Sequence, residues 1–487
     1  MDINKLIELV NPLHVSRTRP DADIPGIVQD SRNVTEGCAF IAIRGTEVDG
    51  HMFLEDAIYQ GAKVLICEES YYTDAPGVCV MEVESTRAIV GKLAQAFADN
   101  PGEKLRIVGI TGTNGKTTTA TLVYQVLKAA GKKASLLGTV SKKILDQELE
   151  SSLTTSGPIE LASDMQKMVD SYCEFLVMEV SSHALAQSRV AGFNFEVGAF
   201  TNLSHDHLDY HNTVEEYAKA KKILFEKLDD SATAIINMDD EYGPFMGTDI
   251  QAEVIEFGFK NERNHILQNS ADGLTLIVNG VHIKSPLVGT FNAYNVGEAF
   301  LICQALGIEQ DVIVEALSEA TGASGRMETV QVEGDDLPLV IVDYAHTPDA
   351  LENVLSTLSE LKEDDQQLTV IFGAGGDRDP MKRPEMAIAA ENLADNVVVT
   401  SDNPRFEDPA AIIDDIMKGF REPGSVTKII SREDAIAETI AHATAKEIIL
   451  IAGKGHEDYQ DVKGTKHPFD DRVKARRALE LKSGGTA

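Results

Sequence analysis

No apolar run in the 487-residue sequence approaches the roughly 18 residues that a membrane-spanning helix requires. The first ten residues, MDINKLIELV, lack the basic start and the small-residue cleavage site of a secretory signal peptide. Five cysteines are scattered along the chain without a CxxC pair, which predicts reduced and mostly buried thiols. Together these absences predict a cytoplasmic protein with no membrane partner.

Positive charge is also scarce. The 44 Lys and Arg residues stand against 78 Asp and Glu residues, which gives a formal net charge of −34. Proteins that bind nucleic acids hold the phosphate backbone with clustered Lys and Arg, so this balance argues against a nucleic-acid partner. An anionic substrate would need positive potential concentrated locally in a cleft. We expect small-molecule substrates and a monomeric chain.

The length exceeds what a single hydrophobic core organises and favours about three domains. Residues 1–98 alternate short apolar runs with helical stretches, which predicts a small N-terminal α/β domain. The polar, turn-rich segment DNPGEKL (99–105) is typical of a linker and opens a central domain, residues 99–328. Residues 329–487 form the predicted C-terminal domain.

Strands and helices alternate through both larger domains. The apolar runs that predict strands cover residues 106–111, 175–180, 198–203 and 232–238 in the central domain, and 338–346, 367–375, 396–404 and 446–455 in the C-terminal domain. Such alternation predicts an α/β fold with two doubly wound, largely parallel sheets. Alternating apolar and polar residues at about 252–290 predict an antiparallel hairpin appended to the central domain.

A glycine-rich loop, within ITGTNGKTTT (110–119), joins a predicted strand to a predicted helix. The backbone N–H groups of such a loop and of the following helix N-terminus form a cradle for anions. Lys116 would reach the β- and γ-phosphates of a nucleotide, and the hydroxyl of Thr117 would coordinate Mg²⁺. The strict pattern GxxxxGK[ST] has glycine where this chain has Ile110, so a tight turn with an exposed lysine is the alternative.

Two polar segments could build a metal site. Glu179 ends a predicted strand, the position at which open α/β sheets bind their ligands. The segment TNLSHDHLDYHNT (201–213) holds three histidines and two aspartates, which suit divalent cations. A zinc-protease site is excluded, because HExxH would need glutamate at the position of Leu208. Considered alone, the segment is explained equally well as a solvated polar loop.

These motifs together resemble the Mur ligase and folylpolyglutamate synthetase superfamily, whose signature is GTNGKT. The resemblance runs from DSRNV (30–34) to GKGHEDY (453–459), nearly the whole chain. It implies a three-domain fold with a small N-terminal α/β domain, a central P-loop-type sheet and a Rossmann-like C-terminal domain. It also implies ATP and Mg²⁺ as cofactors, with ATP between the central and C-terminal domains.

The resemblance implies a role for several residues around ATP. Glu179 and His207 would bind a second Mg²⁺, and Lys221 would be a carbamylated lysine; without the motif, Lys221 would be predicted as a surface lysine. The residues implied to contact ATP are Gly112, Thr113, Asn114, Gly115, Lys116, Thr117, Thr118, Asn292, Asn295, Arg326 and Asp343. The implied metal ligands are Thr117, Glu179, His207 and carbamylated Lys221, and the implied catalytic residues are Lys116, His207, Lys221 and Arg326. The base that deprotonates the incoming amine is not identified, and His207 could act purely as a ligand.

Other segments resemble the family's substrate-binding parts. The residues implied to bind a UDP-muramoyl-dipeptide are Ser31, Arg32, Thr154, Thr155, Ser181, Gln187 and Arg189. Helix capping is the alternative for each Ser and Thr taken alone.

Within the family, SDNPR (401–405) marks the members that add meso-diaminopimelate, whereas lysine-adding members lack an arginine at the position of Arg405. The matching diaminopimelate-binding residues are Arg378, Asp402, Asn403, Arg405, Gly453 and Glu457. A distal amino-acid group needs a cation for its carboxylate and an anion for its ammonium. The alternative for Arg405 is a surface pairing with Glu407 or Asp408.

The implied function is ATP-dependent, ADP-forming addition of meso-2,6-diaminopimelate to the D-glutamate of UDP-N-acetylmuramoyl-L-alanyl-D-glutamate, through an acyl phosphate, in peptidoglycan precursor synthesis. Another ligase of the superfamily is the nearest alternative, and a P-loop NTPase switch or kinase that forms no amide is a further one. A dehydrogenase is disfavoured, because GAGGDRD has Arg378 where GxGxxG needs glycine. The combination of GTNGKT, Glu179 and His207 argues against a pure binding module.

Overall fold

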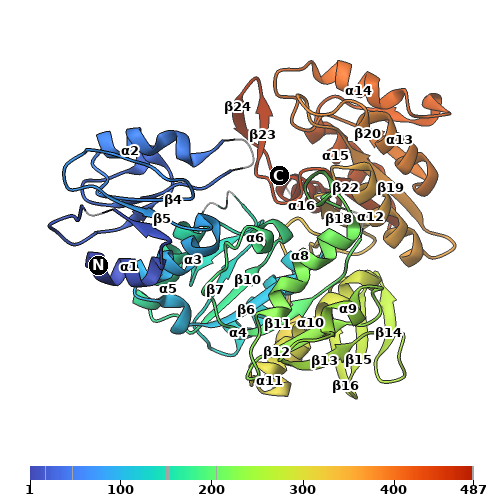
Figure 1. Ribbon diagram of the computed structural model, residues 1–487. Coiled ribbons are helices and arrows are strands. Elements are labelled where there is room, and N and C mark those ends of the chain that lie inside the picture. The colour runs from blue at the N-terminus through green and yellow to red at the C-terminus, as the bar shows by residue number, and fades with distance from the viewer. Residues whose placement is uncertain (17, 46–47, 150, 152, 205, 485–487) are drawn as a thin grey trace. The chain divides into compact units, whose positions relative to one another are not determined.

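The computed structural model describes residues 1–16, 18–45, 48–149, 151, 153–204 and 206–484. The chain forms two compact units (Figure 1). One contains residues 1–257 and 301–308, and the other contains residues 258–300 and 309–487. The predicted α/β class with largely parallel sheets is confirmed, while the predicted domain boundaries after residues 98 and 328 stay predictions. Within the described ranges, no helix is long and apolar enough to cross a membrane.

The first unit begins with a sheet of order β1-β5-β4-β3-β2. Its strands are β1 (His14–Val15), β2 (Ile27–Val28), β3 (Ala39–Ile41), β4 (Val64–Cys67) and β5 (Cys79–Glu82). The strand β1 is antiparallel to β5, and the other neighbours are parallel. Alternate strand residues point to opposite faces. One face packs against α1 (Ile3–Val10) and α3 (Thr86–Phe97), and the other against α2 (Leu54–Tyr59). Two 3₁₀ helices, Ser31–Asn33 and Gly50–Phe53, lie in the connections.

The segment predicted as a linker is packed against its neighbours. It contains a 3₁₀ helix, Pro101–Glu103, in which Pro101 and Gly102 are buried. The N–H of Gly102 donates to Oε1 of Gln95 at 2.9 Å. Turn-forming residues therefore change the chain direction here, but a partner for the backbone keeps the turn in place.

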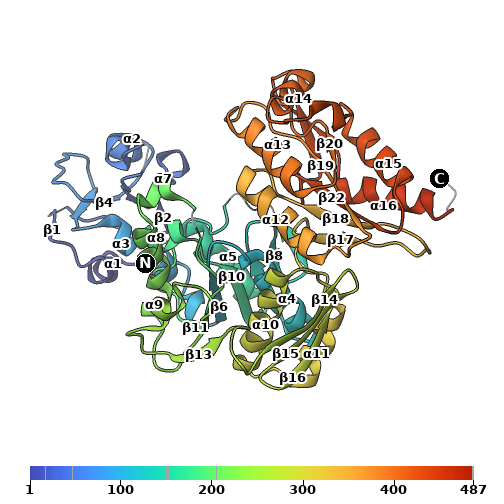
Figure 2. The same ribbon diagram turned by 90° about the vertical axis from the view of Figure 1, so that its right-hand side faces the viewer.

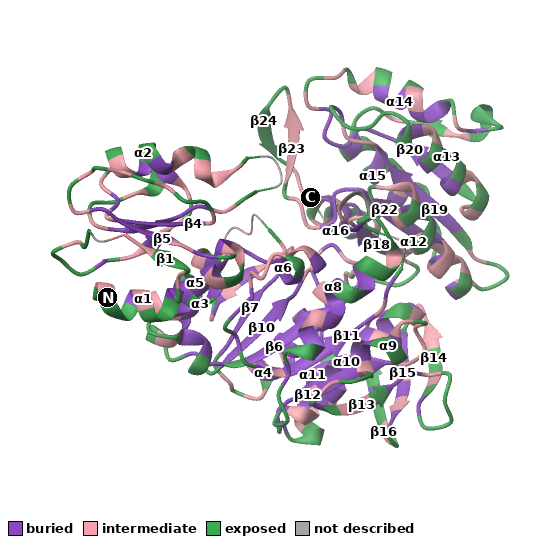
Figure 3. Ribbon diagram, viewed as in Figure 1, coloured by how far each residue is buried: buried purple, intermediate pink, exposed green. Residues whose placement is uncertain are grey.

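The second sheet of the first unit has the order β13-β12-β11-β6-β10-β7-β8-β9. Its strands are β6 (Arg106–Thr111), β7 (Ala134–Leu137), β8 (Lys142–Ile144), β9 (Gln147–Leu149), β10 (Phe175–Glu179), β11 (Phe195–Phe200), β12 (Thr233–Asn237) and β13 (Glu253–Phe257). The pairings from β13 to β7 are parallel, and β8 and β9 continue the sheet antiparallel. The strands at the centre of this sheet are buried (Figure 3).

Helices cover this second sheet and carry the polar segments to its edge. They are α4 (Lys116–Ala129), α5 (Pro158–Asp170), α6 (Ser182–Ala186), α7 (Leu208–His211), α8 (Val214–Glu226) and α9 (Gly243–Gly247). Residues of α5 and α8 share one apolar core with alternate residues of β6 and β10, whereas α4 lies against β6, β7 and β10. Gly115, at φ +86°, starts α4, and Thr213 caps α8 with its hydroxyl.

The second unit begins with the antiparallel element that the sequence predicts. The strands β14 (His265–Ser270), β15 (Gly273–Val278) and β16 (Val281–Ser285) form two consecutive hairpins. The helix α11 (Gln310–Glu319) packs against β16, and α10 (Thr290–Ala305) begins in this unit. The antiparallel prediction for about 252–290 is confirmed for residues 265–285 only, because β13 (Glu253–Phe257) at its start pairs parallel with β12. The antiparallel strands belong to the second unit rather than to the unit that holds the central sheet.

The C-terminal sheet has the order β17-β18-β22-β19-β20-β21. Its strands are β17 (Glu328–Val330), β18 (Leu339–Asp343), β19 (Gln367–Phe372), β20 (Asn396–Val399), β21 (Thr427–Lys428) and β22 (Glu447–Ala452). The strand β17 is antiparallel to β18, and the remaining neighbours are parallel.

Helices cover both faces of the C-terminal sheet, which makes it doubly wound (Figure 2). The helices of one face are α12 (Pro348–Leu361), α13 (Lys382–Leu393) and α14 (Pro409–Met417). The helices of the other face are α15 (Arg432–His442) and α16 (Asp471–Lys482). The connections also hold a 3₁₀ helix, Pro423–Ser425, and a hairpin of β23 (Tyr459–Val462) and β24 (Thr465–Pro468).

Candidate functional site

The glycine-rich loop between β6 and α4 is fixed by the chain that follows β11. The N–H of Thr113 donates to the carbonyl of Asn202 at 2.8 Å, and the N–H of Asn114 donates to its Oδ1 at 3.0 Å. Gly112 has φ +152°, and a Cβ there would lie 1.8 Å from Oγ1 of Thr201. The first-turn N–H groups of α4, which include those of Thr117 and Thr118, have no acceptor within the helix and are the donors that an anion would meet.

Lys116 folds back over this loop. Its Nζ donates to the carbonyl oxygens of Gly112 and Thr113, at 2.9 and 2.8 Å. The ammonium therefore lies above the loop rather than extending away from it as the tight-turn alternative requires. A bound nucleotide phosphate would compete with these two carbonyls for the ammonium.

Glu179 lies beside the start of α4 and is 1% exposed. Its Oε2 accepts a hydrogen bond from the hydroxyl of Thr117 at 3.0 Å. Its Oε1 accepts from the N–H of Thr139 at 2.8 Å, and the Thr139 hydroxyl lies 3.1 Å from Oε2. A Cβ at Gly138 would lie 2.3 Å from Oε1, so only glycine leaves room for the carboxylate. The hydroxyl and the carboxylate are hard oxygen ligands held together, which fits a hard cation such as Mg²⁺.

Lys221 is buried and is directed at the same loop. Its side chain emerges from α8, and its Nζ donates to the carbonyl of Gly112 at 2.6 Å. The Nζ atom also lies 4.3 Å from the ring centre of Tyr217. Burial, reinforced by the charge of Lys116, holds the pKa of Lys221 well below its usual range, while Asp206 acts in the opposite direction. The surface-lysine alternative is wrong for Lys221, although it describes exposed Lys219.

His207 belongs to a group of rings next to α8. Its backbone is in the left-handed region, at φ +53°, and its ring lies 5.0 Å from that of His183 and 6.0 Å from that of Tyr217. His211 bonds through Nε2 to the hydroxyl of Ser182 at 2.9 Å, and burial lowers the pKa of His211. Among the described residues, which leave out His205, no group of three His, Cys, Asp or Glu side chains is arranged to hold a metal ion.

A cavity of about 830 Å³ lies in the first unit. The residues that matter for its chemistry are Gln29, Ser31, Arg32, Arg87, Gln187 and Arg189. It therefore brings together four of the predicted UDP-muramoyl-dipeptide residues: Ser31, Arg32, Gln187 and Arg189. Arg32 pairs with Asp30 and remains largely exposed, whereas Ser31 is buried.

Arg189 links this cavity to the surroundings of Glu179. Its Nη1 donates to the carbonyl of Thr155 at 2.7 Å, and its Nε and Nη2 donate to Oε1 of Gln187 at 3.1 and 2.8 Å. Burial lowers the pKa of Arg189, and the charge of Arg87 acts in the same direction. Two guanidinium groups of one cavity that repel each other are suited to an anionic ligand.

The other three predicted substrate residues lie around Glu179 and do not line this cavity. The hydroxyl of Thr155 donates to the carbonyl of Glu179 at 2.8 Å, and the hydroxyls of Thr139 and Thr154 lie 3.0 Å apart. Ser181 accepts from the N–H of Ala184 at the start of α6, so the capping alternative is confirmed for Ser181. Capping does not exclude a contact between Ser181 and the substrate, so that contact stays a prediction.

The predicted adenine contacts lie in the second unit. Asn292 and Asn295 are 1% and 4% exposed in α10. The Nδ2 of Asn292 donates to the carbonyl of Val288 at 2.8 Å, and its Oδ1 accepts from Asn295 at 3.0 Å. The two asparagines therefore use part of their hydrogen-bonding capacity on each other and on the residue two positions before the helix.

Arg326 precedes Met327 in the chain, and Asp343 contacts the backbone of Met327. Oδ2 of Asp343 accepts from the N–H of Met327 at 2.7 Å, and Oδ1 accepts from that of Ala345 at 2.8 Å. Burial raises the pKa of Asp343, and the charge of Arg326 partly offsets that effect. The guanidinium of Arg326 lies 5.0 Å from the ring centre of Tyr344, which keeps this cation near the carboxylate.

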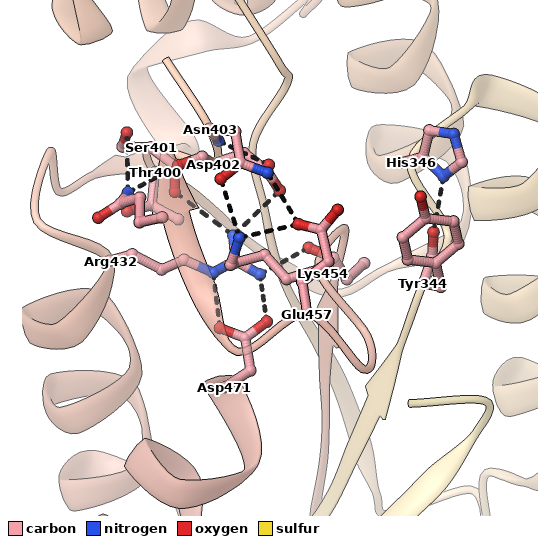
Figure 4. A network of polar contacts seen from close by, with 12 residues as sticks. Tyr344, His346, Thr400, Ser401, Asp402, Asn403, Arg432, Lys454, Glu457 and Asp471 are labelled. Carbon is pink, nitrogen blue, oxygen red and sulfur yellow. Dashed lines mark hydrogen bonds and ion pairs between the residues drawn. The ribbon is translucent and has the colours of Figure 1, made fainter. Parts of the chain in front are cut away.

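The predicted diamino-acid residues meet at the carboxyl ends of β20 and β22. Nδ2 of Asn403 donates to Oε2 of Glu457 at 2.8 Å. Gly453, at φ +121°, leaves space beside Asp402, because a Cβ there would lie 2.5 Å from Oδ2 of Asp402. Four of the six predicted residues, Asp402, Asn403, Gly453 and Glu457, are therefore brought together. Figure 4 shows Asp402, Asn403 and Glu457 in this group.

Arg405 is held next to this group in a left-handed backbone conformation, at φ +49°. Its Nη1 donates to the carbonyl of Gly376 at 2.6 Å. Glu407 pairs instead with Arg383 at 2.7 Å, and Asp408 caps α14, so both carboxylates of the surface-pairing alternative have other partners. Exposed Arg378 also lies near Gly375, because a Cβ there would be 3.6 Å from Cγ of Arg378 and 3.0 Å from Nη1 of Arg405.

Sequence reasoning missed four residues that shape these sites: Thr139, Arg432, Lys454 and Asp471. Lys454 lies within the GKGHEDY motif, which was the sequence signal that could have identified it. Arg432 is the first residue of α15, where an arginine opposes the helix dipole unless another contact holds it. This unfavourable position was the sequence signal that could have identified Arg432.

Three family models match successive parts of the chain. The model of the "Mur ligase middle domain" matches residues 110–303, that of the "Mur ligase, glutamate ligase domain" matches residues 325–455, and that of the "Mur ligase family, catalytic domain" matches residues 23–98.

Curated relatives match the chain from end to end. A UDP-N-acetylmuramoyl-L-alanyl-D-glutamate–2,6-diaminopimelate ligase of Cytophaga hutchinsonii is 42% identical and covers 99% of each chain. One of Bacillus licheniformis is 41% identical over 99% of this chain and 100% of its own. A solved structure of a ligase with the same name is 32% identical, with a TM-score of 0.72 over 98% of each chain.

Proposed function

The chain belongs to the Mur ligase family, and on that premise we propose that it is an ATP-dependent, ADP-forming ligase. It joins meso-2,6-diaminopimelate to the D-glutamate of UDP-N-acetylmuramoyl-L-alanyl-D-glutamate in peptidoglycan precursor synthesis. The γ-carboxylate of D-glutamate attacks the γ-phosphorus of ATP, which gives an acyl phosphate and ADP. The amine of diaminopimelate then attacks the acyl carbon, and phosphate leaves as the amide forms.

The observation that carries this proposal is the meeting of two lysines at one carbonyl. Nζ of Lys116 and Nζ of Lys221 lie 2.9 and 2.6 Å from the oxygen of Gly112. A phosphate-binding loop alone would suit any NTPase and needs only Lys116. The second lysine is buried, and its pKa is held well below the usual value, which favours the amine form that reacts with CO₂ to give a carbamate anion.

The oxygen ligands around Glu179 support magnesium as the metal. Thr117 and Glu179 would hold one ion, and Glu179, His207 and the carbamate of Lys221 would contribute to a second. Bound there, Mg²⁺ supplies charge neutralisation to the phosphates of ATP. Lys116 and the first-turn N–H groups of α4 act in the same direction from the protein side, because they are positioned before the reaction begins.

The remaining predicted residues supply binding and orientation. Arg189 and Arg32 suit the anionic groups of the UDP-muramoyl dipeptide, and Arg326, Asp343, Asn292 and Asn295 would contact the nucleotide. Asp402 and Glu457 suit the ammonium of the diamino acid, and Arg405 suits its distal carboxylate. We further propose that the enzyme acts as a monomer in the cytoplasm, where its five free, buried cysteines would stay reduced.

The test is ADP release with every combination of the three substrates. We expect release to require ATP, the UDP-muramoyl dipeptide and meso-diaminopimelate together. Release with L-lysine, or with a different nucleotide precursor, would identify another ligase of the family. ADP release that needs neither precursor nor amino acid would instead support an NTPase switch.

A further inference from the structure

A fully buried arginine lies behind the proposed diamino-acid residues. Nε and Nη2 of Arg432 donate to the two carboxylate oxygens of Asp471, each at 2.7 Å. Nη2 also donates to the carbonyl of Ala452 at 2.9 Å, and the side chains of Arg432 and Asp471 are both 0% exposed. This pair ties the starts of α15 and α16 to the end of β22 (Figure 4).

Asp402 stands in front of that pair with one oxygen unused. Its Oδ1 accepts from the N–H of Asn403 at 2.6 Å. Its Oδ2 is buried and has no hydrogen-bond partner among the described residues, and it lies 3.9 Å from Nη1 of Arg432. Because Gly453 has no side chain, nothing from that residue covers this oxygen. A buried carboxylate oxygen without a donor is costly unless a ligand supplies one.

A second buried cation holds the neighbouring carboxylate. Nζ of Lys454, whose side chain is 0% exposed, lies 3.0 Å from Oε2 of Glu457 and 3.1 Å from Oδ1 of Asn403. Oδ1 of Asn403 also accepts from the N–H of Asp461 at 2.9 Å, which leaves its Nδ2 to donate to Glu457. The orientation of the amide is therefore fixed by its donors.

The charges in this network do not balance. Asp402, Glu457 and Asp471 are acidic, whereas Arg432 and Lys454 are basic, which leaves one negative charge in excess. The side chains of Asp402 and Glu457 are 10% and 18% exposed, whereas the side chains of Arg432 and Lys454 are 0% exposed. The network therefore holds one more acidic than basic side chain, and its partly exposed members are Asp402 and Glu457.

We propose that Arg432, held by Asp471, is a positioning residue for the ammonium group of the incoming amino acid. Arg432 holds the carboxyl group of Asp402 in the orientation in which its Oδ2 can accept an N–H from that ammonium. This inference rests on the proposed function, since it takes the amino acid as the ligand of Asp402. It assigns to Arg432 a role through Asp402, without contact with the substrate.

The test compares three forms of Arg432 in the full-length enzyme. Arg432→Met should raise the KM for diaminopimelate at least about tenfold, while the KM values for ATP and for the UDP precursor change less than about twofold. Arg432→Lys keeps the charge and should recover part of the loss. Because breaking a buried ion pair can unfold a domain, the third form is the double variant Arg432→Met/Asp471→Leu. Replacing both partners by apolar residues of similar size often restores stability.

The double variant separates positioning from structure. If it melts like the wild type but keeps the raised KM for diaminopimelate, the positioning role is supported. If it regains both stability and the wild-type KM, Arg432 is only structural and the inference is wrong. An unchanged KM in Arg432→Met would also overturn it.

Arg106 provides a control for Arg432. Arg106, at the start of β6, makes the same kind of bidentate pair with Glu196 and also donates to the carbonyl of Leu306 at 3.0 Å. Arg106→Met should lower stability without a selective effect on any KM. The wild-type assay tests the premise separately. A wild-type enzyme that does not use diaminopimelate at all would contradict the proposed function rather than this role of Arg432.

Discussion

The Nζ atom of Lys221 lies 2.6 Å from the carbonyl oxygen of Gly112, although the two residues are 109 positions apart. The strand β6 ends just before Gly112, and α8 brings Lys221 to the same edge of the sheet. A buried amine at this position faces the loop that would hold the phosphates. Burial lowers the pKa of Lys221, which favours the amine form over the ammonium compared with an exposed lysine.

We predict that Lys221 reacts with CO₂ to form a carbamate and a proton. Lys221→Ala should lower ligase activity at least about a hundredfold, because the anion that orients the phosphoryl group is lost. Short carboxylic acids should restore part of the activity by occupying the space of the carbamate. Carbon-13 NMR of enzyme equilibrated with labelled CO₂ should show a carbamate carbonyl.

The control for this prediction is Lys219→Ala, which removes an exposed lysine from the same helix. It should leave activity and CO₂ labelling unchanged. Observation of an unmodified amine at Lys221 in an active, substrate-bound enzyme would contradict the prediction.

Lys116→Ala should abolish ADP release and leave the thermal melt of the substrate-free protein nearly unchanged. The side chain donates to the carbonyls of Gly112 and Thr113, whereas in the reaction it would stabilise charge on the γ-phosphate. We expect a loss of at least about a hundredfold in kcat. Lys128→Ala is the control, since Lys128 is in the last turn of α4 and pairs with Asp146. Near wild-type turnover in Lys116→Ala would rule out the assignment.

Arg405→Ala should raise the KM for diaminopimelate at least about tenfold, which is roughly 1.4 kcal/mol. The guanidinium is held at the carbonyl of Gly376, so little entropy is lost when it binds the distal carboxylate. The KM for ATP should stay the same. L-Lysine lacks the distal carboxylate, so the variant should lose discrimination between the two amino acids.

Arg421→Ala is the matched control for Arg405, because Arg421 is an exposed arginine of the same domain. It should change none of the three KM values. A wild-type enzyme that prefers lysine, or an Arg405→Ala variant with an unchanged KM for diaminopimelate, would contradict the specificity assignment.

The strands and the loop could be predicted because their signals are local. Apolar runs and glycine positions predict β6, the loop and α4 within one continuous segment, residues 106–129, and Glu179 follows from the end of β10 in the same way. The predicted linker illustrates the limit of local signals. Composition identified the turn, whereas the packing of Gly102 against Gln95 depends on the tertiary structure.

The residues that the sequence did not reveal come from distant positions. Thr139 meets Glu179 across 40 residues, and Arg432 meets Asp471 across 39. No spacing rule joins such pairs, because the order of strands in the sheet decides which loops are neighbours. Burial of Lys221 was hidden for the same reason. Its own helix is rich in charge, and only the packing of α8 on the sheet removes it from water.

Glu298 in α10 gives a prediction about stability. It is completely buried, and neither carboxylate oxygen has a hydrogen-bond partner in the described part of the chain. Burial holds the pKa of Glu298 well above its usual value of 4.5.

A raised pKa in the folded state means that the stability present below about pH 4.5 is lost as the pH rises toward the folded-state pKa. Glu298→Gln cannot ionise, so its advantage over the wild type in urea unfolding should grow as the pH rises above about 4.5. The exposed Glu315, changed to Gln, should show no such trend. A difference for Glu298→Gln that stays constant or shrinks with pH would mean that this carboxyl ionises normally in the folded protein.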